Sequence, residues 1–243
     1  MKIKMIYHTS DIRRREVTPA EEEYSEAVFT LAGRVGEPVK ISGLAKQLHV
    51  KAPSVVQMLE KLKRKGLMIY ERHTGAKLTE KGRELAAKIV RRHKLAERLL
   101  VDVFGQDLYK VHDDACKLEH AIDDELADKI EKKLGEPSMC PHGNPIPTSK
   151  GNLPRNDRVE LVDIGEGQEC TITTIPEERE AVQRLISLNM LPKSKIKVVE
   201  KLPRGAVLVQ CGSTQVALSR GVASQILVRG RRRRARHRRG RGS

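Results

Sequence analysis

The chain has 243 residues, which is room for about two or three small domains. Hydrophobic residues make up 38% of it, charged residues 33% and aromatic residues only 2%, with no Trp, which argues against binding of single-stranded nucleic acid on aromatic platforms. The formal net charge is +15, and nine Arg within residues 229–243 leave about +6 on the rest, so the composition favours polyanions as partners.

The cysteines and the apolar runs indicate a cytoplasmic protein. Four widely spaced Cys form no C-x-x-C pair and do not resemble the disulfide framework of a secreted domain. The N-terminal apolar run is too short for a signal peptide, and no run approaches the ~18 apolar residues that a membrane-spanning helix needs. We therefore expect a cytoplasmic location and reduced thiols.

Residues 18–78 have the pattern of a winged helix-turn-helix that follows a charged arm at 1–17. Thr18, Pro19 and Glu21 are typical of a helix start, as N-cap, first helical residue and capping-box acid. The predicted helices after it are 41–48 and 52–65, and the predicted wing strands are 67–70 and 76–78. This is the element order of a winged-helix DNA-binding domain.

The helix at 52–65 would be the recognition helix of that domain. Gln57 can pair with adenine, and Ser54 can contact a base edge or a phosphate. An ordinary helical hairpin with a solvated face is the alternative, and the predicted wing, with its basic residues, makes it the weaker one. The residues that we expect at DNA are Lys51, Pro53, Ser54, Gln57, Lys61 and Arg64, with Lys63 as a further phosphate contact.

Three further helices are predicted at 79–104, 108–121 and 123–134, and we assign 79–147 to a helical domain. Residues 135–155 are rich in Pro, Gly, Asn and Ser and predict a linker, which we place at 148–158.

Short strands with alternating polarity follow, and they predict a small β-barrel at 159–229. The predicted strands are 170–175, 196–200, 206–210 and 215–218, interrupted by an amphipathic helix at 177–188. The Arg-rich tail, 230–243, has the composition of a disordered segment. We favour contacts with DNA phosphates for it; binding to RNA or a membrane surface, and no role at all, are the alternatives.

Two clusters of metal-type ligands stand on neighbouring predicted helices. His93 and Glu97 are four residues apart, and a second set follows at similar helical spacings: His112, Cys116, Glu119 and His120. Thiolate together with imidazole favours Fe(II), Co(II), Ni(II) or Zn(II) over Mn(II), and the mixed set disfavours a closed structural zinc site.

Four stretches resemble the diphtheria-toxin-repressor family of iron- and manganese-dependent transcriptional regulators. They are LTEKGR (78–83), RRHKLAERLL (91–100), VHDDACKLEH (111–120) and CPHGNPIP (140–147). The barrel is similar to the SH3-like domain, in its ferrous-transport-A-like (FeoA) form, that ends many members. The resemblance implies a mainly α N-terminal part, made of a winged helix-turn-helix and a helical dimerisation domain, followed by a small all-β SH3-like barrel.

The resemblance also implies a homodimer with two metal sites per subunit. His93, Glu97 and His112 would belong to one site, and Cys116, Glu119 and His120 to the other, completed by Glu23 and Glu26 from the first helix. Cys116 is an iron-type residue, whereas Glu23 and Glu26 are nearer the manganese type. We favour Fe(II), because thiolate is the more selective ligand, with Mn(II), Co(II), Ni(II) or Zn(II) able to bind in vitro.

In the family's iron sensors the barrel also supplies metal ligands. The residues at those positions here are Thr173 and Pro176, whose side chains are poor metal ligands. Glu177 or Glu178 would substitute, or would simply favour a solvated helix N-terminus. We expect a structural role for Cys140 and His142 in the linker, and core thiols at Cys170 and Cys211.

The sequence as a whole therefore predicts a metal-dependent repressor, with Fe(II) favoured, and not an enzyme. As a homodimer it would bind palindromic operator DNA and regulate metal-homeostasis genes, with no membrane or small-molecule partner. The alternatives are a Mn(II)-responsive regulator of the same family, a metal-dependent hydrolase, and a metal-independent regulator or iron-transport accessory protein.

Overall fold

The computed structural model describes residues 17–32, 37–153 and 157–230. The predicted arm up to residue 16 and the tail from residue 231 lie outside the described residues. The chain forms two compact units: the first runs up to Val90 and includes Ser149–Asn152, and the second comprises Arg91–Thr148 and the chain from Leu153 onward. Each unit is described by itself.

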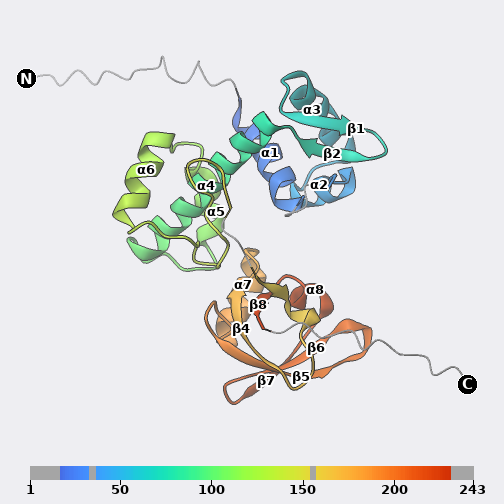
Figure 1. Ribbon diagram of the computed structural model, residues 1–243, viewed down its shortest axis with the longest axis vertical. Helices are drawn as coiled ribbons and strands as arrows, with labels where there is room; N and C mark the ends of the chain where they lie inside the picture. The colour runs from blue at the N-terminus through green and yellow to red at the C-terminus, as the bar shows by residue number, and fades with distance from the viewer. Residues whose placement is uncertain (1–16, 33–36, 154–156, 231–243) are drawn as a thin grey trace, which may run out of the picture. The chain divides into compact units, whose positions relative to one another are not determined.

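The first unit is a winged helix-turn-helix, as predicted (Figure 1). Glu21 accepts the backbone N–H of Thr18 at 2.7 Å, so the predicted capping box forms at the start of the first helix. Gly66, with φ +70°, ends the third helix and allows the chain to turn into the wing. The elements are α1 (Pro19–Leu31), α2 (Ile41–Gln47), α3 (Ala52–Arg64), β1 (Met68–Glu71) and β2 (Gly75–Leu78).

The core of this unit explains which face of α3 remains outside. Val55, Leu59 and Leu62 are wholly buried, at the helical spacing of four and three residues. They pack with α1 and α2 side chains such as Val28 and Leu44. The opposite face of α3 is therefore exposed to solvent, as a recognition helix requires.

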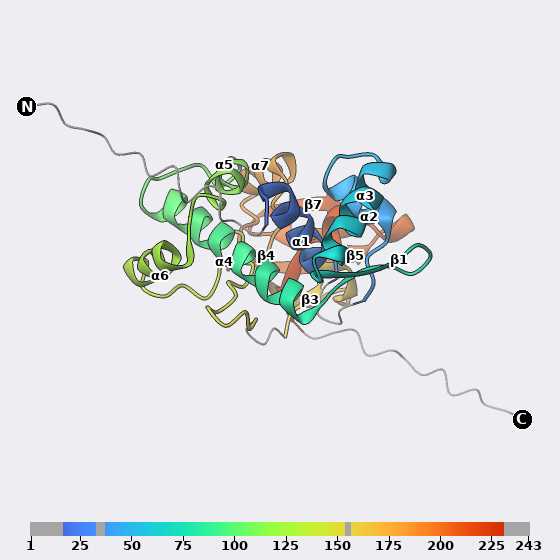
Figure 2. The same cartoon turned by 90° about the horizontal axis from the view of Figure 1, so that it is seen from above.

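Helix α4 (Glu80–Asp102) is one unbroken helix of 23 residues (Figure 2). In the second unit its later turns pack with α5 (Val111–Leu118) and α6 (Asp124–Lys133). Arg91, almost fully buried, ties α4 to α6 through Asp128 at 2.7 Å and Glu131 at 2.5 Å. The predicted helix 108–121 is wrong at both ends, because α5 begins after Lys110 and is capped at Glu119.

The segment after α6 is not a loose linker, and that part of the prediction is wrong. Cys140, His142 and Ile146 are buried, and Met139 forms an isolated bridge with Pro145. Cys140 and Ile146 belong to the core of the helices. Pro and Gly here form a compact, well-packed turn. These residues favour turns by their backbone conformation, and a turn need not be mobile.

The barrel is a six-stranded antiparallel sheet with strand order β3-β8-β4-β5-β6-β7. Its apolar residues alternate along the strands and fill one core, as in β4, where Cys170, Ile172 and Thr174 are buried. Leu108 and Tyr109, just before α5, pack against this core. The strands are β3 (Val159–Glu160), β4 (Glu169–Thr174), β5 (Lys195–Lys201), β6 (Val207–Cys211), β7 (Thr214–Leu218) and β8 (Leu227–Arg229); the helices are α7 (Arg179–Ser187), α8 (Arg220–Ala223) and two 3-10 turns, Leu161–Asp163 and Pro203–Gly205. Within the described ranges, the structure holds no helix long and apolar enough to cross a membrane.

Candidate metal centre

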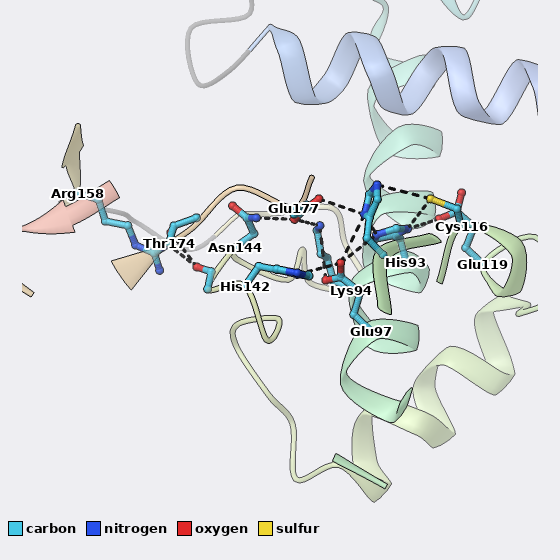
Figure 3. A network of polar contacts seen from close by, with 12 residues as sticks. His93, Lys94, Glu97, Cys116, Glu119, His142, Asn144, Arg158, Thr174 and Glu177 are labelled. Carbon is cyan, nitrogen blue, oxygen red and sulfur yellow. Dashed lines mark hydrogen bonds and ion pairs between the residues drawn. The ribbon is translucent and has the colours of Figure 1, made fainter. Parts of the chain in front are cut away.

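The predicted ligands of α4 and α5 face one another in the second unit (Figure 3). His93 and Glu97 stand one turn apart on α4, and His112 and Cys116 one turn apart on α5. His93 Nε2 lies 3.1 Å from His112 Nδ1 and 3.3 Å from Glu97 Oε1. The first predicted ligand group is therefore brought together.

The second predicted group adjoins the first at His93. The other ring nitrogen of His93, Nδ1, lies 2.6 Å from Glu119 Oε2. Cys116 Sγ lies 3.9 Å from the same nitrogen and 3.8 Å from His112 Nε2. His120 is further out, with Nε2 3.5 Å from Glu119 Oε1. Glu119 lies just beyond α5, so the shorter helix still delivers it to the cluster.

Glu177, from the chain just before α7, completes the first group. Its Oε2 lies 3.5 Å from His112 Nδ1. Its Oε1 accepts hydrogen bonds from Lys94 Nζ and from Asn144 Nδ2, the latter at 2.5 Å. Glu178, by contrast, caps α7 by accepting the N–H groups of Glu180 and Ala181. Of the two acids that the sequence leaves open, Glu177 is thus the one at the cluster.

Cys140 and His142 also reach this cluster, which the sequence did not predict. His142 Nδ1 lies 3.2 Å from Glu97 Oε1, yet neither ring nitrogen has a well-oriented hydrogen-bond partner among the described residues. Two sets of ligand atoms each lie within 4.8 Å of one another: His93, Glu97, His112 and Glu177, and Glu97, Cys140, His142 and Glu177. The C-x-H spacing of Cys140 and His142 is a feature that could have indicated a metal site, but the Pro-rich segment around it favoured a structural role.

The ionisable groups of this cluster shift one another's pKa values. Burial disfavours a charged imidazole, but hydrogen bonds with Cys116 and Glu97 outweigh burial and raise the pKa of His112 to about 10. The pKa of His93 also rises well above its usual value, because Cys116, Glu119 and Glu97 outweigh burial and the charge of Lys94. Burial raises the pKa of Cys116, yet the two imidazoles bring it below its ordinary value.

The donor set fits a divalent transition metal. Imidazole nitrogens, carboxylate oxygens and thiols converge here, and the raised pKa values of His93 and His112 favour protons, and with them positive charge, on the two imidazoles. A bound divalent ion would supply that charge instead and release the protons. The buried nitrogens of His142, which make no well-oriented hydrogen bond with the described residues, are a further sign of ligand capacity at this place.

Glu23 and Glu26 lie on α1, in the other unit, where Glu23 is exposed and Glu26 half-buried. Their place among the ligands stays a prediction.

The predicted DNA contacts lie on the outer face of α3, at its start and along its length. Lys51, Pro53, Ser54, Gln57, Lys61 and Arg64 are all exposed. Lys61 is also within 3.2 Å of buried Glu21, and Lys63 donates to the carbonyl of Tyr70, so these two lysines have partners within the fold.

Comparison with known proteins identifies three matching segments. Residues 16–76 match the family described as iron dependent repressor, N-terminal DNA binding domain; residues 79–148 match its metal binding and dimerisation domain; and residues 159–230 match the FeoA domain. The iron-dependent repressor IdeR of Mycobacterium tuberculosis is 30% identical over 227 residues, covering 88% of this chain and 98% of that protein. The diphtheria toxin repressor of Corynebacterium diphtheriae is 37% identical over 145 residues, covering 60% of this chain and 59% of that protein.

Solved structures agree. A manganese-dependent transcriptional repressor in complex with manganese is 29% identical, with a TM-score of 0.80 over 86% of this chain and 99% of that one. The IdeR of T. acidophilum is 25% identical, with a TM-score of 0.75 over 89% of this chain and 100% of that one.

Proposed function

This chain belongs to the iron-dependent repressor family, and we propose that Fe(II) activates it to repress metal-homeostasis genes. As a member, it is a metal-dependent transcriptional repressor and not an enzyme. It carries a DNA-binding domain and a metal-binding and dimerisation domain. The finer points, which are the metal, its ligands and the form of the operator, are our proposals.

The observation that carries the proposal is the convergence of His93, Glu97, His112 and Glu177. Their ligand atoms lie within 4.8 Å of one another, and three of the four side chains come from α4 and α5. We assign these residues to one metal site. Cys140 and His142 lie beside the carboxylates of Glu97 and Glu177 and are further candidate metal ligands. Burial raises the pKa of the Cys140 thiol well above its usual value, so the thiol would have to lose its proton to bind a metal.

The remaining predicted ligands would form a second site. In our proposal Glu23 and Glu26 of α1 act with Cys116, Glu119 and His120. A bound ion supplies the charge that neutralises these carboxylates. Without that charge the acidic groups repel one another and α1 is less constrained. Metal would therefore shift the population towards a fixed arrangement of the recognition helices, which bind two half-sites about one helical turn apart on palindromic DNA.

Fe(II) is our choice of metal because Cys116 offers a thiolate, and its lowered pKa favours that form. The Mn(II) alternative is supported by the carboxylates Glu23 and Glu26, and by the likeness to a manganese-dependent repressor. Both readings keep the same protein class and differ in the ion that activates it.

A metal titration of DNA binding tests the proposal. Operator DNA would first be selected from a random pool with the full chain, and binding then measured anaerobically with Fe(II), Mn(II), Co(II) and Zn(II). We expect Fe(II) to activate at lower free concentration than Mn(II). Activation by Mn(II) at the lower concentration would move the assignment to the manganese alternative, and equal binding with and without every metal would overturn metal control.

A further inference from the structure

A lysine is buried among the ligands of the first metal site. Lys94 lies on α4 next to His93, and only 8% of its side chain is exposed. Its Nζ contacts Glu177 Oε1 directly and lies 3.7 Å from Glu97 Oε2. A buried ammonium needs such partners, because an unpaired buried charge is strongly unfavourable.

Lys94 and Asn144 both bind one carboxylate oxygen of Glu177, and the other oxygen lies towards the imidazoles (Figure 3). Both donate to Oε1, Asn144 from 2.5 Å. Oε2 lies 3.5 Å from His112 Nδ1. One carboxylate oxygen is thus held by the protein while the other is presented to the metal site, which is how outer hydrogen bonds orient a ligand.

Glu177 is also a charged contact in the junction between the barrel and the helices of the second unit. The backbone N–H of Ile175 donates to the carbonyl of His142 at 3.0 Å, and Thr174 Oγ1 donates to that of Gly143 at 3.1 Å. These hydrogen bonds need no metal. The carboxylate of Glu177, however, would be buried beside Glu97 and repelled by it if it lacked a cation.

We propose that Lys94, assisted by Asn144, is a positioning residue that holds Glu177 at the cluster when no metal is bound. The metal site is then assembled before the ion arrives, and the barrel stays docked in both states. The inference rests on the proposed function in one respect, that the cluster binds metal. If Lys94 lost its charge, Glu177 would keep only His112 and the neutral amide of Asn144 as partners, and docking would depend much more on the bound ion.

Hydrogen exchange of the Ile175 amide in the full-length protein measures this docking, because that amide bonds across the junction. We expect slow exchange in the wild type both without metal and with Co(II) as the probe ion. In Lys94→Met, exchange without metal should be roughly 10-fold faster or more, the equivalent of one hydrogen bond to a charged group. Co(II) should restore most of the protection.

Matched variants separate positioning from general stability. Lys94→Arg keeps the cation and should behave like the wild type. Lys129→Met removes an exposed lysine on α6 and should change nothing. Asn144→Leu removes a neutral donor and should show the Lys94→Met pattern more weakly. Lys94→Met combined with Glu177→Gln removes the carboxylate that Lys94 holds, so metal-free docking should return even if the single variant folds poorly.

Two results would overturn the inference. One is unchanged exchange in metal-free Lys94→Met. The other is faster exchange that Co(II) and the Glu177→Gln partner both fail to reverse, which would make Lys94 a packing residue only. The metal-free comparison involves no ion, so it decides the role of Lys94 even if Co(II) absorption spectra showed that the wild type binds no metal, a result that would sink the proposed function instead.

Discussion

Glu21 links the first helix to the recognition helix through a buried carboxylate. Its side chain is fully buried, with Lys65 Nζ at 2.8 Å and Lys61 Nζ at 3.2 Å. Burial alone would raise the pKa of Glu21, but Lys65, the Thr18 N–H and Lys61 outweigh it and lower the pKa to about 2. The ionised form is therefore part of the folded state of the DNA-binding unit.

Replacing Glu21 with Gln should destabilise the first unit at neutral pH by about 1–3 kcal/mol, the usual cost of losing hydrogen bonds to a charged group. A carboxyl whose pKa is lowered by folding stabilises above its unfolded pKa, and the contribution is lost as pH falls from 4.5 to about 2. Denaturant unfolding of the wild type and the variant should thus converge over this range. Glu60→Gln, on the exposed face of α3, is the control; a difference that stays constant with pH would contradict this account of Glu21.

Among the elements, the loop after α6 depends on one glycine for its contact with the barrel. Gly143 has φ +87°, and a Cβ built on it would lie 1.9 Å from the carbonyl oxygen of Thr173 in β4. No side chain fits between two backbones at that distance. The loop that carries Cys140 and His142 can therefore lie against the barrel only with glycine here.

Gly143→Ala should weaken this junction. We expect a cost of about 1–3 kcal/mol or more from the strained backbone, with faster exchange of the Ile175 amide. Gly135→Ala is a matched control, because Gly135 also has a positive φ, +74°, but nothing within 4 Å of the added Cβ. Equal effects of the two substitutions would mean that the close approach to Thr173 is unimportant.

The elements also show what sequence patterns can predict. Helix α3 was predicted because Val55, Leu59 and Leu62 repeat at helical spacing, and the strands β4–β7 because they alternate in polarity. Strands β3 and β8 are two and three residues long, too short for any period to show.

The metal centre was predicted only in part for a similar reason. His93 with Glu97, and His112 with Cys116, lie on single helices, where spacing fixes their common face. Glu177 and His142 reach the cluster through tertiary packing. In the chain they lie 83 and 48 residues after Lys94, respectively. No local pattern records such an encounter.

At the scale of the whole molecule, two exposed apolar residues just after α4 bear on how the chain forms a dimer. Phe104 is 69% exposed and Val103 57%, which are large apolar side chains in water. They fall within the segment that matches the metal binding and dimerisation domain. An exposed apolar patch of this kind is typical of an interface, and a two-fold dimer would bury it twice.

Phe104→Glu should therefore weaken the dimer by about 100-fold or more, since burying one aromatic side chain contributes roughly 1.5–3 kcal/mol and two copies are lost. Sedimentation of the wild type and the variant over a range of concentrations would measure it. Ile186→Glu changes an exposed apolar residue of the barrel and should leave the dimer intact. If Phe104→Glu dimerises like the wild type, the interface lies elsewhere.

The central claim is that a metal ion controls DNA binding through the predicted ligands. Anaerobic operator-binding isotherms of the full chain, with and without Fe(II), test it most directly when Cys116→Ala is measured in parallel. We predict that Fe(II) strengthens binding by the wild type at least about 10-fold, a coupling free energy of about 1.4 kcal/mol, and leaves folded, dimeric Cys116→Ala unable to respond. A normal metal response in Cys116→Ala, or identical wild-type isotherms with and without Fe(II), would contradict the account.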